Sequence, residues 1–128
     1  MREVIKILKA QHGKFVICGS LALYLHGLIE DYDNEEIDII VDQKVSPFNE
    51  VSKPRFGCSG ASYKIHNVSI DVFNKPLPEH DKIVVDGLIM YIKTLSALKK
   101  HYLSLDIDKL GGHKLFQNKM MTRVALFK

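Results

Sequence analysis

Three acidic residues stand where they could hold a metal ion. Glu36 and Asp38 belong to an apolar run at residues 36–41, which predicts a buried strand. Because successive side chains of a strand point to opposite faces, the two carboxylates share one face, about 6.5 Å apart along the chain. A third acid, Asp71, interrupts the apolar run at residues 68–73. If that strand lies beside the first, about 4.8 Å away, the three carboxylates surround a common site.

Such an acidic group favours a divalent cation over other ligands. Three uncompensated carboxylates at this range repel one another, and a bound cation holds all three in the ionised form. The alternative for Asp71 is an exposed acid on a sheet face. Zinc is not expected, because the six histidines are scattered without the spacing of zinc ligands.

A Gly-Ser turn precedes the acidic strand. Residues 14–18 form an apolar run that predicts an interior strand, and Ser20 is expected to cap a buried helix that ends at Gly27. Gly19 lacks a Cβ, so another backbone or a phosphate can approach it closely. Free N–H groups at the start of the helix could hold phosphates. The alternative is a strand-to-helix turn with no ligand.

The order of these parts resembles the nucleotidyltransferase superfamily with the DNA polymerase beta-like fold. The signature of that superfamily is a hydrophobic residue followed by Gly-[Gly/Ser], then [Asp/Glu]-hydrophobic-[Asp/Glu], then a lone acid on a later strand. Here the three parts are Gly19-Ser20, Glu36-Ile37-Asp38 and Asp71. The resemblance covers about residues 14–103.

The resemblance implies the transfer of a nucleotide from a nucleoside triphosphate (NTP) to an acceptor hydroxyl. Glu36, Asp38 and Asp71 would act as the catalytic, metal-binding residues and hold two Mg²⁺ ions. Asp71 would bind the ion nearest the acceptor and help to draw off the hydroxyl proton. The acceptor could be a protein, an RNA or a small molecule, and neither it nor the particular NTP follows from the sequence.

The resemblance also implies which residues contact the nucleotide. Gly19 and Ser20 would meet its phosphates. Lys99 would be a third phosphate contact, because minimal members of the superfamily place a helix lysine there. Lys99 falls on a helix that Thr94 is expected to cap and that runs to about Leu103.

Two other functions stay open. One is a catalytically inactive protein of this fold that binds proteins or nucleic acids. It is favoured by Glu36, where Asp is more usual, and by Tyr32 and Asn34, where many members have basic and hydroxyl residues. The other is RNA binding through a basic tail, since the chain from Lys93 onward has eight Lys or Arg against two acids, whereas the first 92 residues have ten against thirteen. Solvated lysines would explain the tail equally simply.

The pattern of the chain predicts one α+β domain over residues 1–128, with a mixed, mostly antiparallel sheet flanked by helices. Its core would span about residues 14–103 and a helical tail residues 104–128. The expected elements are a helix at 2–11, strands at 14–18 and 36–41, a loop at 43–60, hairpins at 61–73 and 83–92, a helix at 94–103 and a broken helix at 106–127. Lys53 and Arg55 in the loop could reach a substrate, although an ordinary exposed loop explains them as well.

Composition is consistent with a cytoplasmic globular protein. The 128 residues are 46% hydrophobic and 26% charged, with a net charge of +3. No apolar run approaches the about 20 residues that span a bilayer, so no membrane segment is expected. Cys18 and Cys58 form no Cys-x-x-Cys pair and are expected to be reduced thiols. The oligomeric state does not follow from the sequence.

Overall fold

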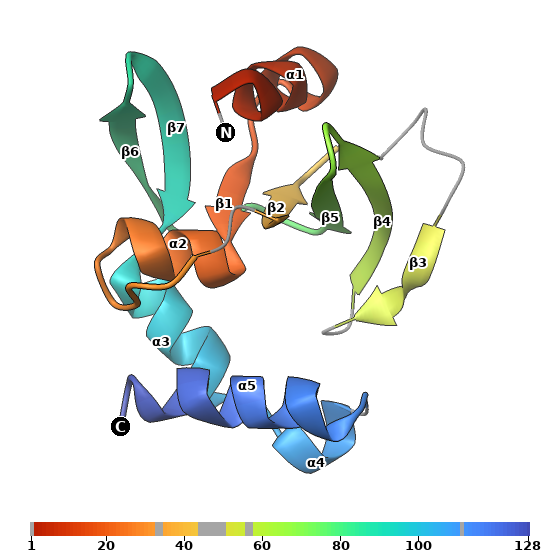
Figure 1. The fold of residues 1–128 in the computed structure, drawn as a ribbon, viewed down its shortest axis with the longest axis vertical. Coiled ribbons are helices and arrows are strands. Elements are labelled where there is room, and N and C mark those ends of the chain that lie inside the picture. The colour runs from red at the N-terminus through yellow and green to blue at the C-terminus, as the bar shows by residue number, and fades with distance from the viewer. Residues whose placement is uncertain (1, 33–34, 44–50, 56–57, 111) are drawn as a thin grey trace. The chain divides into compact units, whose positions relative to one another are not determined.

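The helices and strands of the chain belong to two units, Met1–Lys93 and Thr94–Lys128. The computed structural model describes residues 2–32, 35–43, 51–55, 58–110 and 112–128 (Figure 1). Asn34, which the sequence analysis named, lies outside these residues. The backbones of Lys53 and Arg55 are described, but their side chains are not.

A mixed sheet forms the centre of the first unit. Among the described residues it has seven strands in the order β3-β4-β5-β2-β1-β7-β6. The pairs β1–β7 and β2–β5 are parallel, and the other neighbouring pairs are antiparallel. The strands are β1 (Val16–Cys18), β2 (Glu36–Val41), β3 (Val51–Arg55), β4 (Cys58–Ile65), β5 (Val68–Asn74), β6 (His80–Val85) and β7 (Leu88–Lys93). The predicted α+β fold with a mixed, mostly antiparallel sheet is confirmed.

Helix α1 (Arg2–His12) begins the chain as an amphipathic element. Its buried side chains, Val4, Ile5 and Leu8, follow the spacing of one helical face. The helix ends at Gly13, whose φ of +69° lies in the left-handed region and whose N–H donates to the Lys9 carbonyl at 2.9 Å. The predicted helix and its glycine stop are confirmed.

Helix α2 (Gly19–Leu25) follows β1 without a loop and packs on β1 and β2. It buries the consecutive residues Leu21, Ala22 and Leu23. The prediction that Ser20 caps this helix is wrong. The N-cap residue is Cys18, no side chain caps the helix, and Ser20 lies inside the first turn because the chain enters the helix directly from the strand.

Strands β2 and β5 carry the alternation that the sequence predicts. Ile37 and Ile39 of β2 are fully buried, as are Ile70 and Val72 of β5, while the acidic residues between them are partly exposed. One face of this strand pair therefore belongs to the hydrophobic core. The other face presents the carboxylates.

The loop predicted for residues 43–60 is partly wrong. Strand β3 falls within this segment, and β4 begins at Cys58. The prolines and glycines of this segment indicated a loop, but Pro54 lies within β3. Because β3 is an edge strand, a residue without an N–H group can lie in it and leave the rest of the sheet intact.

Two tight turns set the register of the hairpins. His66 and Asn67 have φ values of +48° and +67°, which join β4 to β5 through a two-residue turn with both residues left-handed. Asp86 and Gly87 join β6 to β7 in the same way, with φ values of +50° and +78°. Both predicted hairpins are confirmed, although β6 begins at His80, earlier than expected.

The second unit is helical. Its described helices are α3 (Leu95–Leu103), α4 (Ile107–Leu110) and α5 (Lys114–Ala125). Thr94 caps α3 as predicted, since its hydroxyl accepts from the Ala97 N–H at 3.1 Å. Tyr102 of α3 is buried and stacks on Phe127, with ring centroids 5.7 Å apart. Leu98 of α3 is also buried, whereas Leu95 is 46% exposed.

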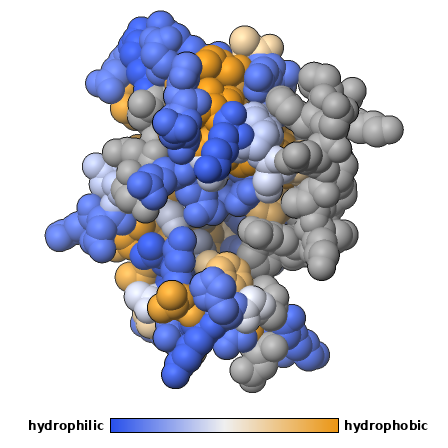
Figure 2. Space-filling view, turned by 45° about the vertical axis from the view of Figure 1, so that its right-hand side comes forward, coloured by the Kyte–Doolittle hydropathy of each residue, from blue (hydrophilic) through white to orange (hydrophobic). Residues whose placement is uncertain are grey.

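Hydrophilic residues cover much of one face of the molecule (Figure 2). Figure 2 shows one face on which hydrophobic residues occur between large hydrophilic areas. None of the helices that the structure describes combines the length and the hydrophobicity needed to cross a bilayer.

We expect His12 to make the fold sensitive to acid. Its ring shares a hydrogen bond of 2.8 Å with the Tyr63 hydroxyl, and burial lowers the pKa of His12 below its usual 6.5. The imidazole of His12 therefore binds a proton more readily in the unfolded chain than in the folded protein. As a result, the free energy of unfolding falls as the pH drops below about 6.5. Urea unfolding at pH 7.5 and 5.5 should show a smaller loss in His12→Gln than in the wild type. An equal loss in both proteins would contradict the assignment.

Candidate metal centre

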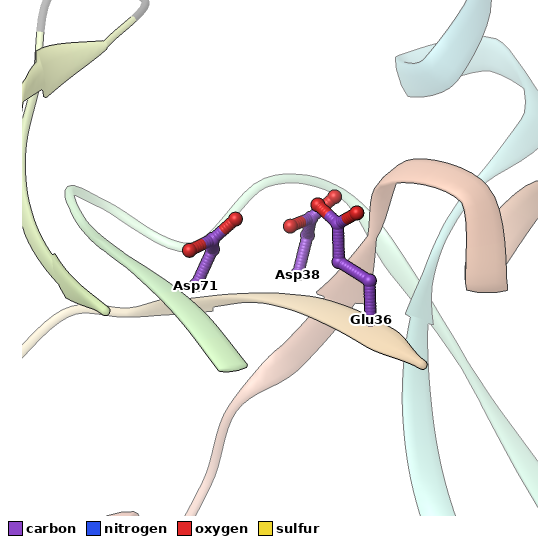
Figure 3. A group of neighbouring side chains, drawn as sticks. All are labelled: Glu36, Asp38 and Asp71. Carbon is purple, nitrogen blue, oxygen red and sulfur yellow. The ribbon is translucent and has the colours of Figure 1, made fainter. Parts of the chain in front are cut away.

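The parallel pairing of β2 with β5 brings the three acidic residues together. In the register, Asp38 lies directly opposite Asp71, and Glu36 stands two residues before Asp38 on the same face of β2. Figure 3 shows all three carboxylates projecting to the same side of these strands. The sequence analysis predicted a common site on the condition that the strands at 36–41 and 68–73 lie side by side. In the structure these strands, β2 and β5, are neighbours.

The geometry of the acidic group suits a hard divalent cation. Each of the three residues offers one carboxylate oxygen, and these oxygens lie within 4.8 Å of one another. Oxygens on opposite sides of one Mg²⁺ lie about 4 Å apart, because each Mg–O bond is 2.0–2.1 Å long. Two metal ions of a phosphoryl-transfer site lie about 3.5–4 Å apart. Small rotations of the partly exposed carboxylates are therefore enough for them to bind metal.

Ser62 fixes the orientation of the Asp71 carboxylate. It lies opposite Asp71 in the β4–β5 register, and its hydroxyl donates to Asp71 Oδ1 at 2.6 Å. The sequence analysis missed this residue. It could have been found, because a two-residue turn at His66-Asn67 determines the pairing of β4 with β5 as far as Ser62.

The Gly19 turn touches the acidic group. Cys18 pairs with Asp38 across β1 and β2, so the first residue of α2 lies beside the Asp38 side chain. A Cβ built on Gly19 would come within 2.2 Å of Asp38 Oδ2, and Gly19 has a left-handed φ of +62°. Both the backbone conformation and the neighbouring carboxylate thus require glycine here.

Tyr32 holds the chain where it enters β2. Its hydroxyl donates to the backbone carbonyl of Glu36 at 2.6 Å, and its ring lies against Tyr24 with centroids 5.5 Å apart. Tyr32 therefore fixes the backbone that carries the first acidic residue.

The remaining predicted contact residues lie on different elements. Ser20 is partly exposed in the first turn of α2, next to Gly19. Lys99 is exposed on α3 in the second unit. The contact of either residue with a nucleotide stays a prediction.

Comparison with known proteins identifies the fold. No protein-family model and no curated protein matches the chain. Among solved structures, it is similar to the crystal structure of a protein from Thermotoga maritima that is provisionally described as a nucleotidyltransferase. The two are 13% identical, with a TM-score of 0.53, and the match covers 97% of this chain and 91% of the other. The fold is nucleotidyltransferase-like.

The comparison agrees with the resemblance seen in the sequence at the level of the fold. At 13% identity the likeness concerns the path of the chain and not its chemistry. Within this nucleotidyltransferase-like fold, the described residues include a group of three carboxylates that could hold a metal ion.

Proposed function

We propose that the chain is a metal-dependent nucleotidyltransferase, which moves a nucleotide from an NTP to a hydroxyl of an acceptor. The observation that supports this is the placement of three carboxylate oxygens within 4.8 Å of one another on adjacent strands of a nucleotidyltransferase-like fold. Hard oxygen ligands in this number fit Mg²⁺.

Each carboxylate has a role in the proposed reaction. Glu36, Asp38 and Asp71 would hold two Mg²⁺ ions. When bound, these ions neutralise phosphate charge and stabilise the leaving pyrophosphate. Asp71 accepts the proton of the attacking hydroxyl. The hydroxyl oxygen bonds to the α-phosphorus as the bond to the β-phosphate breaks, and pyrophosphate leaves. Ser62 keeps the Asp71 carboxylate oriented for this transfer.

The nucleotide would lie against the turn that follows β1. Backbone N–H groups at Gly19 and Ser20 would donate to its phosphates, and Lys99 would supply a positive charge from α3. The partner is an NTP, and the acceptor is a protein, an RNA or a small molecule.

The test is to heat the wild type and Asp71→Asn with Mg²⁺ and each of the four NTPs in turn. An NTP present at 100 times its Kd adds about 2.7 kcal/mol to the stability of the folded state, which raises the midpoint of thermal unfolding. We expect one or more NTPs to stabilise the wild type, and the same NTP, labelled, to be transferred to an acceptor in cell extract by the wild type and not by Asp71→Asn.

Two results would contradict the proposal. If no NTP at millimolar concentration shifts the wild type, the nucleotide site is wrong. If an NTP binds but Asp71→Asn transfers label as fast as the wild type, the acidic group is not the catalytic site. The first result would favour the alternative, a binding module built on this fold.

A further inference from the structure

Lys93, the last residue of β7, is a buried cation that the proposed mechanism does not use. It is 6% exposed, although lysine is almost never buried unless it is paired. Its backbone carbonyl bonds to His26 Nε2 at 2.7 Å. Enclosing a charge to this extent is costly to the fold.

The sheet places Lys93 in line with the acidic group. In the parallel register of β1 with β7, Val16 pairs with Tyr91 and Ile17 with Ile92, so the next position brings Lys93 beside Cys18. Cys18 in turn pairs with Asp38, which lies opposite Asp71.

Residues in register on neighbouring strands share a face of the sheet. Lys93 is therefore on the carboxylate face, two strand spacings or about 10 Å from Asp38 across the sheet. That separation suits a ligand that binds metal at one end and extends negative charge toward β7.

A second lysine increases the positive charge at this point. Burial lowers the pKa of Lys93; the thiol of Cys18 opposes this effect, and the charge of Lys75 lowers the pKa further. Lys75 follows β5 directly, and its N–H donates to the Val41 carbonyl at 3.1 Å. Two ammonium groups close enough to repel each other are both stabilised by an anion between or beside them.

We propose that Lys93 binds a phosphate group of the nucleotide whose other phosphates the metal holds at the acidic group. This assignment rests on the proposed function and adds a residue to it that the signature of the superfamily does not contain. The ligand class is a polyphosphate anion, and Lys75 contributes to the same charge.

The experiment compares Lys93→Met with the wild type and with Lys82→Met, which removes an exposed lysine of β6. The probe is inorganic tripolyphosphate with Mg²⁺, because it carries the phosphates without a base and needs no knowledge of the NTP. We expect Lys93→Met to bind tripolyphosphate at least about tenfold more weakly, the loss of one charge-assisted hydrogen bond. Lys82→Met should bind as the wild type does.

Two further readouts separate a binding role from a structural one. Without ligand, Lys93→Met should have a higher midpoint of thermal unfolding than the wild type, because methionine of similar length replaces a charge that burial disfavours. Its affinity for Mn²⁺ alone, measured by electron paramagnetic resonance, should be unchanged, because the carboxylates are intact.

Equal tripolyphosphate affinities of Lys93→Met and the wild type would overturn the assignment, as would a wild type that binds an NTP but not tripolyphosphate. A lower midpoint of Lys93→Met without ligand would also overturn it, since the lysine would then serve the fold. Failure of the proposed function would be seen separately, as a wild type that binds no Mn²⁺.

Discussion

Replacing Asp38 with asparagine should remove metal binding without weakening the fold. In the absence of metal, each pair of carboxylates in the acidic group repels by about 1 kcal/mol when water screens fully, so a neutral side chain relieves repulsion. In the presence of Mn²⁺ the wild type gains stability in proportion to its metal affinity, and Asp38→Asn should lose this gain. Urea unfolding with EDTA, and again with millimolar Mn²⁺, measures both effects.

The control for this variant is Asp81→Asn. Asp81 is an exposed acid on β6, outside the acidic group, so its loss changes the net charge by the same amount. We expect Asp81→Asn to keep the full stabilisation by Mn²⁺. If Asp38→Asn also keeps it, the three carboxylates do not form a metal site.

Replacing Gly19 with alanine should damage both the fold and the acidic group. The left-handed φ of +62° costs an alanine about 1–2 kcal/mol. In addition, the new Cβ would lie 2.2 Å from Asp38 Oδ2 and 3.1 Å from Asp38 Cβ, so the Asp38 side chain must move. We expect Gly19→Ala to lose more stability than backbone strain alone explains, and to lose at least about tenfold in Mn²⁺ affinity.

Gly13→Ala separates the two causes. Gly13 has nearly the same backbone conformation, with φ +69°, but nothing lies within 4 Å of a Cβ built there. Gly13→Ala should therefore lose only the stability that backbone strain costs, and its Mn²⁺ affinity should equal that of the wild type. Similar losses of stability and metal affinity in both variants would mean that the contact between residue 19 and Asp38 is unimportant.

The parts of the site that follow local rules could be predicted from the sequence. The alternation of isoleucine with acid in β2 determines which side chains share a face, and the turn at Asn67 determines the partner of β5 on one side. The partner on the other side is a long-range choice. That β5 runs parallel to β2 follows from the packing of the whole first unit, which no short pattern records.

The errors have local causes of their own. A helix that continues directly from a strand needs no capping side chain, so Ser20 was given a role that the backbone makes unnecessary. Lys93 was counted only as part of a basic tail. Its burial depends on the position of the final strand within the sheet, and a lysine in a sequence gives no sign that it is enclosed.

The order of the strands also determines when the acidic group can exist during folding. The sheet joins residues 16 and 91 in one strand pair and residues 38 and 71 in another, so its central contacts are far apart in the sequence. Such contacts form late, because a long loop must close before they contribute stability. We therefore expect the three carboxylates to come together only when β2 pairs with β5, so that a metal ion finds all three ligands only after this pairing has formed.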